Sequence, residues 1–397
     1  MAFDFIHEAL TRRKHDKLWR SRHVIESAVD ALIQVDGQHY LNFSSNDYLG
    51  LRRSTVVAQA WVDGIAEYTA GSGASPLVTG YTQAHHDLEV YLAKVLKRDK
   101  VLLFNSGFAA NQAICQALFT GQSSQSQDLI VADKLIHASL VDGAQASDAL
   151  FKRFRHNDCQ HLSAILSSHN AAQADSNKLI VSEGVFSMDG DQAPVAELVH
   201  IAQQHDAWLM LDDAHGFGVL GENGLGVSEL HNLSQAQLPV LMATFGKAIG
   251  TAGAFIAGSA ELIDYLVNFA RHYIYSTAMP AAQAHATLVS IKANVDPSRR
   301  NILQARIKQF KQLASTANIP LLASDTAIQP VLIGDTERTL LVSEKLKSLG
   351  IWASAMRYPT VPKGSDRLRI TLSAIHQERD IVALVDALSL AMSSPSK

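Results

Sequence analysis

Short apolar runs alternate with longer amphipathic stretches through most of this chain. The runs are rich in β-prone residues and lie at 101–104, 129–132, 178–184, 207–213, 239–245 and 253–258. The stretches between them, such as ANQAICQALF and PVAELVHIAQQH, place apolar residues at i, i+3 and i+4. Helices of this kind cover both faces of a mostly parallel sheet. The pattern therefore predicts a large, doubly wound α/β domain.

The pattern changes after about residue 290. A long charged helix is followed by a strand in AIQPVLIG, another helix, the extended stretches IWASAMRY and RLRITLS, and a closing helix. This order predicts a smaller C-terminal α+β domain over residues 290–397, after a large domain over 46–289. Residues 1–45 are predicted to form a helix and an arm that pack with the small domain. The polar segment TGQSSQSQD, at 120–128, is predicted to be a surface loop.

Composition narrows the possible functions. The 397 residues are 47% hydrophobic and 18% charged, as in a soluble protein with a large core. With 34 Lys+Arg against 38 Asp+Glu, the net charge of −4 argues against nucleic-acid or polybasic membrane contacts. No apolar stretch approaches the length of a membrane span, and the N-terminus lacks the apolar core of a signal peptide. Since two cysteines make no disulfide framework, we expect a cytoplasmic protein.

Three motifs suggest sites that their surroundings do not support. GFGVLG matches a dinucleotide fingerprint, but ENGLG follows where a helix would have to begin. HNDCQH has loosely zinc-like spacing without a second cluster, and a polar turn is the simpler interpretation. SMDGDQAP lacks the acidic residue that closes a calcium loop. We therefore predict no metal site and no dinucleotide site.

Polar side chains follow the ends of several predicted strands. LMLDDAHG brings Asp212 and His215 to the end of one strand, and DKLIHASL and VFSMDGD place His137 and Ser187 just after two others. Taken singly, Asp212 has the simpler interpretation of a turn cap, His137 of a core histidine and Ser187 of a loop hydroxyl. The carboxyl ends of parallel strands, however, meet at one edge of a sheet, where ligands bind.

Two further features complete a set of groups with one chemistry. NSGFAANQ opens a helix directly after a strand, and its free N–H groups at Gly107 and Phe108 suit a phosphate. MATFGKAIGTAGAFIAG holds Lys247 among small and apolar residues, although most lysines simply extend into water. A lysine, a carboxylate, an imidazole and a phosphate-binding helix end are what a pyridoxal phosphate site requires.

Motifs along nearly the whole chain resemble the α-oxoamine synthases, which are fold-type I pyridoxal phosphate enzymes. They are NFSSNDYLGL, GSGASPLVTGYTQAHHDLE, NSGFAANQA, DKLIHASL, SEGVFSMDGD, LDDAHGFGVLGENG, TFGKAIG and YSTAMP. The resemblance implies an acyltransferase with a large doubly wound domain and a smaller C-terminal domain. It also implies a homodimer, because IYSTAMP resembles the turn that reaches the partner's phosphate site.

The resemblance assigns roles to individual residues. Lys247 is similar to the lysine that forms the Schiff base with the cofactor, Asp212 to the partner of the pyridine nitrogen, and His137 to the residue stacked on the ring. The other residues implied for the cofactor are Gly107, Phe108, Ser187, His215 and Thr244. Those implied for the substrate are Arg20, Thr360 and Arg369, with Arg22 as the alternative to Arg20.

Within this family, the motifs most resemble the branch that condenses L-alanine with a pimeloyl thioester at the first step of biotin ring assembly. The sequence leaves open whether the carrier is coenzyme A or acyl carrier protein. The alternatives are another α-oxoamine synthase, of the glycine C-acetyltransferase or aminolevulinate synthase type, a fold-type I aminotransferase, or a pyridoxal phosphate-binding regulator without catalytic activity. No basic winged-helix segment precedes the catalytic motifs, which disfavours the regulator.

Overall fold

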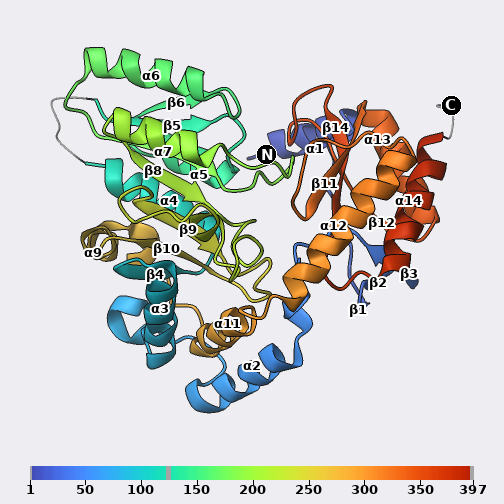
Figure 1. Cartoon of the computed structure of the whole chain (residues 1–397), viewed down its shortest axis with the longest axis horizontal. Helices are drawn as coiled ribbons and strands as arrows, with labels where there is room; N and C mark the ends of the chain where they lie inside the picture. The colour runs from blue at the N-terminus through green and yellow to red at the C-terminus, as the bar shows by residue number, and fades with distance from the viewer. Residues whose placement is uncertain (1, 122–126, 394–397) are drawn as a thin grey trace.

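A seven-stranded sheet forms the centre of the computed structural model, which describes residues 2–121 and 127–393 (Figure 1). The strand order is β4-β10-β9-β8-β7-β5-β6. The bounds are β4 (Lys100–Phe104), β5 (Leu129–Asp133), β6 (Leu150–Phe154), β7 (Lys178–Glu183), β8 (Trp208–Asp212), β9 (Val240–Thr244) and β10 (Ala254–Gly258). Five neighbouring strands, β9 to β6, run parallel, whereas β10 is antiparallel to β9 and β4. The predicted mostly parallel α/β sheet is confirmed.

Helices cover both faces of this sheet, because its central strands are apolar on both sides. Every residue of β5 and β7 is buried. One face packs against α3 (Gln83–Leu96), α6 (Cys159–Ala172), α7 (Val195–Gln204) and α11 (Ala281–Ala293). The other face packs against α4 (Gly107–Phe119), α5 (Ala138–Gln145), α9 (Ala260–Phe269) and α10 (Arg271–Ile274). The doubly wound arrangement leaves the carboxyl edge of the sheet for a site.

Shorter elements complete this part of the fold. Helix α2 (Thr55–Tyr68) crosses α11 closely at Gly64, where a Cβ atom would lie 2.9 Å from the Cα of Ala282. The short helices are η1 (Leu51–Arg53), η2 (Pro76–Gly80) and α8 (Val227–Leu230). Residues 122–126, most of the predicted polar loop, lie outside the described residues.

Two smaller sheets belong to the terminal parts of the chain. The first, in the order β11-β14-β13, consists of β11 (Ile328–Gly334), β13 (Ser354–Met356) and β14 (Asp366–Thr371). It packs with α12 (Ser298–Thr316), α13 (Thr336–Ser348) and α14 (Glu378–Ser393). The second contains β1 (Ser27–Val29), β2 (Leu32–Val35), β3 (Gln38–Asn42) and β12 (Ile351–Trp352). Because β3 pairs with β12, the N-terminal hairpin lies beside the C-terminal part.

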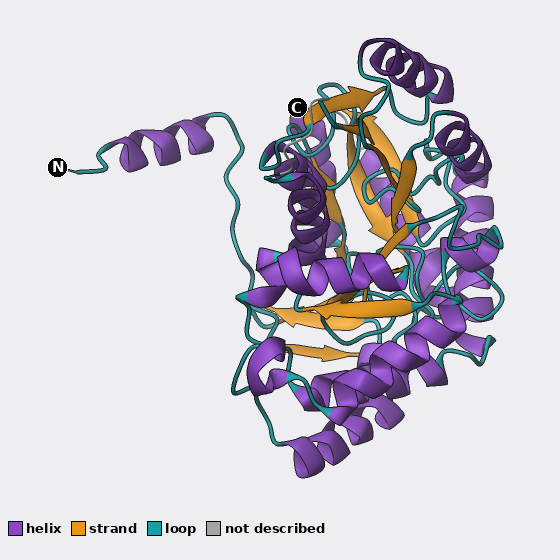
Figure 2. Cartoon of the chain, turned by 90° about the vertical axis from the view of Figure 1, so that its left-hand side faces the viewer, coloured by secondary structure: helices purple, strands orange, loops and turns teal. Residues whose placement is uncertain are grey.

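Helix α1 (Phe5–His15) stands away from the rest of the molecule (Figure 2). None of its residues is buried, although Lys17, just beyond it, contacts Glu337 at 3.0 Å. The domain boundaries at 45/46 and 289/290 stay a prediction. Among the described residues, no helix has the length and apolar character needed to cross a membrane.

Candidate active site

The carboxyl ends of β7, β8 and β9 lie side by side and carry polar side chains. These strands end at Glu183, Asp212 and Thr244, and Glu183 lies opposite Asp212 in the strand register. Lys247 follows β9 by three residues, in a turn whose Gly250 N–H donates to the Lys247 carbonyl at 3.0 Å. The structure thus brings the predicted lysine to the same edge as the predicted carboxylate.

Lys247 is half-buried in a charged environment. Burial lowers the pKa of its amine to about 8, although attraction to neighbouring carboxyl groups, Asp212 first, opposes the shift. An amine with this pKa is partly deprotonated near neutral pH. It is therefore able to act as a nucleophile and as a base.

Three buried carboxyl groups surround this amine. Asp212, 5% exposed, accepts hydrogen bonds from Asn111 Nδ2 at 2.8 Å and from the Ala214 N–H at 3.0 Å. The pKa values of Glu183 and Asp213 are raised well above normal, first by burial and also by the charge of Asp212. The three carboxyl groups therefore do not all ionise together.

His215 is buried beside the hydroxyl of Tyr48, at 2.6 Å from Nδ1. Burial lowers the pKa of this imidazole well below its normal value, and the positive charges of Lys247 and Arg369 lower it further. Burial also raises the pKa of the Tyr48 hydroxyl, which keeps its proton. The pair is thus a neutral hydrogen-bonding unit between the N-terminal segment and the end of β8.

His137 caps the N-terminus of α5 and has Phe108 as a neighbour. Its Nδ1 lies 2.7 Å from Ser139 Oγ and accepts from the Ser139 N–H at 3.3 Å. The rings of His137 and Phe108 are nearly perpendicular, in a T-shaped arrangement with centroids 6.4 Å apart. The structure thus brings these two predicted residues together.

The N-terminus of α4 lies against the end of β9. Ser106 caps the helix by accepting from the Ala109 N–H at 3.2 Å, and a Cβ atom on Gly107 would lie 3.1 Å from Thr244 Cγ2. A larger residue at Gly107 would therefore press on Thr244. The free N–H groups at this helix end suit an anion, as the sequence predicts.

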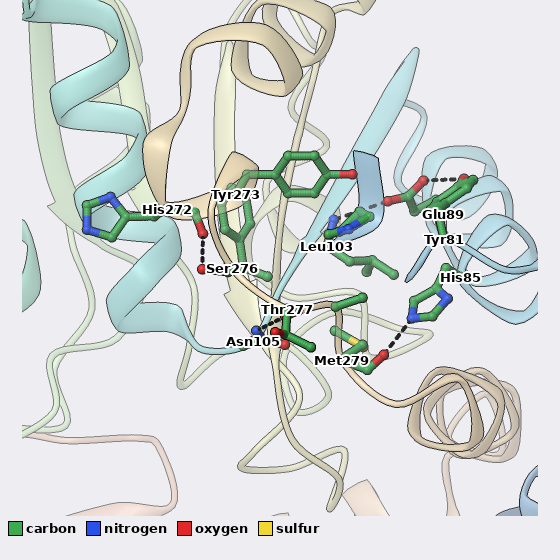
Figure 3. Close-up of a pocket in the computed structure, with 13 residues that line it drawn as sticks. Tyr81, His85, Glu89, Leu103, Asn105, His272, Tyr273, Ser276, Thr277 and Met279 are labelled. Atoms are coloured by element: carbon green, nitrogen blue, oxygen red, sulfur yellow. Dashed lines mark hydrogen bonds between the residues drawn. The ribbon is translucent and has the colours of Figure 1, made fainter. Parts of the chain in front are cut away.

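A small cavity lies beside the turn before α4, and several polar side chains line it (Figure 3). Asn105 Nδ2 donates to the Thr277 carbonyl at 2.7 Å. In the cavity, Tyr81 donates to Glu89 Oε2 at 2.7 Å, and burial raises the pKa of Glu89 to about 7. The bond from Asn105 holds Thr277 beside the N-terminus of α4.

Arg369, on β14, connects the small sheet to the loop after β7. Its Nε donates to the Ser187 carbonyl at 2.6 Å, and both terminal nitrogens lie 3.2 Å from Asn46 Oδ1. The neighbouring Arg367 is paired with Asp189. Ser187 and Arg369, both predicted from the sequence, are therefore adjacent.

Arg20 and Thr360 lie apart from this buried cluster. Arg20 is exposed on the arm after α1, and Thr360 is exposed in the turn that follows Tyr358. The structure brings together the other nine predicted residues along the sheet edge, β14 and the ends of α4 and α5. The substrate roles of Arg20 and Thr360 stay predictions.

Sequence reasoning missed several polar residues that the structure places in the cluster. They are Asn46, Tyr48, Asn111, Ser139 and Glu183. The sequence holds signals for three of them: NFSSNDYLGL contains Asn46 and Tyr48, and Asn111 follows Gly107 by one helical turn.

The donor set fits pyridoxal phosphate. The lysine amine of lowered pKa can bind an aldehyde, the buried carboxyl group of Asp212 can pair with a protonated pyridine nitrogen, and neutral His215 can meet a ring hydroxyl. The N-terminus of α4 supplies the place for the phosphate.

Comparisons with known proteins point to one family. The family model for aminotransferase class I and II matches residues 38–388. The 8-amino-7-oxononanoate synthase of Aeromonas hydrophila is 49% identical over 382 residues, covering 96% of this chain and 93% of the relative. That of Nitrosococcus oceani is 46% identical over 380 residues, covering 96% and 98%.

Solved structures of related enzymes also superpose on this chain. A serine palmitoyltransferase of S. paucimobilis, with a bound aldimine of PLP and myriocin, superposes with a TM-score of 0.90 at 25% identity, covering 98% of this chain and 97% of the other. The 8-amino-7-oxononanoate synthase of Francisella tularensis gives a TM-score of 0.76 at 30% identity, covering 88% and 97%.

Proposed function

The chain belongs to the 8-amino-7-oxononanoate synthases of the class I and II aminotransferase family, and we propose that it condenses L-alanine with a pimeloyl thioester. The products are 8-amino-7-oxononanoate, carbon dioxide and the free thiol carrier. This reaction opens the assembly of the biotin ring.

The observation that carries the proposal is the position of Lys247. Its amine, with a pKa of about 8, lies at the carboxyl edge of the sheet beside the carboxyl group of Asp212 and the neutral His215. These are the groups that a carbanion reaction on an amino acid requires. Pyridoxal phosphate, when bound, supplies the electron sink for that carbanion.

The protein's own groups divide the remaining work. Lys247 would hold the cofactor, and its free amine would remove the proton from the alanine Cα atom. Asp212 stabilises a positive charge on the ring nitrogen, and Asn111 and the Ala214 N–H hold this carboxylate in place. His137 covers one face of the site and donates a hydrogen bond to the carbonyl oxygen of the thioester.

Arg369 is the proposed partner of the alanine carboxylate. Its guanidinium is buried and oriented by Ser187 and Asn46, so it is preorganised for a planar anion. After the new C–C bond forms and the thiol leaves, this carboxyl group departs as carbon dioxide. Arg20 and Thr360 are proposed to contact the substrate from exposed segments.

A homodimer forms part of the proposal. The segment around Tyr275 lies beside η2, where the Ala278 N–H donates to the Ala74 carbonyl at 3.0 Å. Tyr275 is 72% exposed and Val78 is 74% exposed, so this surface presents apolar groups next to the N-terminus of α4. Analytical ultracentrifugation tests it: a monomer at micromolar concentration would contradict the dimer. The cytoplasmic location stays a prediction.

Product analysis tests the reaction directly. The purified protein is incubated with pyridoxal phosphate, L-alanine and a panel of acyl thioesters on coenzyme A and on acyl carrier protein, and the products are identified by mass spectrometry. We expect an amino ketone with carbon dioxide release only where the acyl group is pimeloyl. Equal or better turnover with glycine, or a keto acid without carbon dioxide, would contradict the proposal.

A further inference from the structure

A buried chain of hydrogen bonds connects two residues of the site that lie on different elements. Asn111 Nδ2 donates to Asp212 Oδ2 at 2.8 Å and also to Ser139 Oγ at 3.0 Å. Ser139 Oγ lies 2.7 Å from His137 Nδ1. Asn111 is 1% exposed and Ser139 is fully buried, so water does not replace these partners.

The direction of each hydrogen bond follows from the carboxylate. Asp212 accepts only, so the Asn111 amide must turn its nitrogen toward it. The second N–H of that amide then points at Ser139 Oγ, which receives a hydrogen bond there. The Ser139 hydroxyl hydrogen is left for the other neighbour of Oγ, the His137 Nδ1 atom.

Two donors therefore meet at one nitrogen of His137. The Ser139 hydroxyl and the Ser139 backbone N–H, at 3.3 Å, both point at Nδ1, which has to accept. The proton of the neutral ring then belongs on Nε2. We propose that Asn111 and Ser139 are positioning residues that transmit the orientation of the Asp212 carboxylate to His137 and fix its proton on Nε2.

Helix α4 links this arrangement to the anion-binding end of the site. Asn111 stands four residues after Gly107, on the same face of α4, and α4 packs against α5, which carries Ser139. The helix that offers its N-terminus to an anion thus also holds the carboxylate. The tautomer of His137 follows from these hydrogen bonds alone. The role of its Nε2–H as a hydrogen-bond donor to the substrate rests on the proposed function.

Nitrogen NMR of the whole protein labelled with ¹⁵N-histidine tests the tautomer. Spectra are recorded with and without pyridoxal phosphate at about pH 8, and His137→Gln assigns the signals. The wild-type ring should be a single Nε2–H tautomer. A free neutral imidazole populates both tautomers, so Ser139→Ala should shift the ratio about 3- to 10-fold toward Nδ1–H, and Ser139→Thr should restore it.

Asn111→Ala tests the Asp212 end of this series of hydrogen bonds. It removes a charge-assisted hydrogen bond from Asp212, so the dissociation constant of the cofactor should rise about 10-fold, while Ser139→Ala should leave it within about 2-fold.

In product assays, Ser139→Ala should lower kcat without raising the KM for alanine. Ser343→Ala is the matched control, because this buried hydroxyl donates to the Ala353 carbonyl far from the site and its loss should change neither readout.

The results separate this inference from the proposed reaction. A wild-type His137 that is doubly protonated or divided between tautomers would overturn the inference, as would an unchanged tautomer ratio in Ser139→Ala. A single Nε2–H tautomer that responds to Ser139→Ala, in a protein that does not consume alanine, would support the inference and contradict the reaction.

Discussion

Two acid and histidine clusters lie near the carboxyl edge of the large sheet. In the first, His156 bridges Asp133 at 3.0 Å and Asp191 at 2.8 Å. Burial would lower the pKa of His156, but the hydrogen bonds and charges of both carboxylates raise it to about 10. In the second, the cluster of Asp212, His215 and Lys247, the pKa values of the imidazole and the amine are both lowered.

The difference lies in the partners and not in the residue types. His156 meets two acids whose hydrogen bonds and charges favour its protonated form, and the cluster ties the loop that carries Asp191 to the end of β5. His215 contacts the neutral hydroxyl of Tyr48. Lys247 lies near several carboxyl groups that cannot all be ionised at once. The first cluster is a structural clasp, whereas the second keeps a reactive amine.

Removing the amine should have the largest effect. Lys247→Ala eliminates the covalent attachment of the cofactor and the base, so turnover should fall by about 10⁴-fold or more, with loss of the absorbance of the lysine-bound cofactor. Lys178→Ala is the control, since Lys178 is also buried but begins β7, at the opposite edge of the sheet. An unchanged cofactor spectrum in Lys247→Ala would refute the assignment.

Exchanging one carboxylate in each cluster tests the comparison directly. Asp212→Asn keeps the shape but loses the charge that pairs with the ring nitrogen, so kcat should fall on the order of 10²- to 10³-fold while circular dichroism stays native. Asp133→Asn should lower the free energy of unfolding and leave the cofactor spectrum unchanged. Activity near wild type in Asp212→Asn would remove that residue from the role.

Arg369 and Arg367 offer a second matched pair on one strand. Arg369→Lys keeps the charge but loses the planar fork, so the dissociation constant of alanine should rise about 10- to 100-fold with an intact cofactor spectrum. Arg367→Lys should leave alanine binding unaltered, because Arg367 is already paired with Asp189. Titration of alanine against the cofactor absorbance measures both, and equal responses would contradict the carboxylate contact.

Sequence reasoning identified the strand ends more readily than the partners of each side chain. The apolar run ending in Asp212 predicts a strand followed by polar residues, and β8 does end there. The apolar run that forms β10 does not reveal the direction of the strand, because an apolar pattern looks the same in both directions. In the structure β10 is antiparallel to β9. The apolar residues of α1 predict a helix but not a partner, and Phe5 is 65% exposed.

Residues that act through distant contacts could not be found in the same way. Tyr48 reaches His215 across 167 residues of sequence, and Glu183 becomes the neighbour of Asp212 only because β7 pairs with β8. HNDCQH predicts a polar turn, and nothing in its sequence indicates that His156 meets Asp133 and Asp191. Burial and pairing, which set the charge state of these groups, emerge only from the fold.

The lowered pKa of Lys247 predicts how cofactor binding depends on pH. Only the neutral amine attacks an aldehyde, so the rate of covalent attachment to cofactor-free protein should rise about tenfold per pH unit well below pH 8 and level off above it. Stopped-flow absorbance measures this rate. A rate that still rises tenfold per unit between about pH 9 and 10 would show an ordinary lysine.

The smallest effect on turnover is expected at the clasp. His156→Gln should change kcat by less than about 2-fold, but it removes an ion pair that is only partly exposed, which should cost about 1–3 kcal/mol of unfolding free energy near pH 6.

The pKa of His156 is higher in the folded chain, at about 10, than its ordinary 6.5. Its stabilisation is therefore complete below about pH 6.5 and is lost as the pH rises through 10. Urea unfolding of wild type and His156→Gln at about pH 6, 8 and 10 should show a difference that shrinks with each step. A constant difference would mean that His156 acts by packing against Phe186, whose ring lies 4.5 Å from its own, and not by charge.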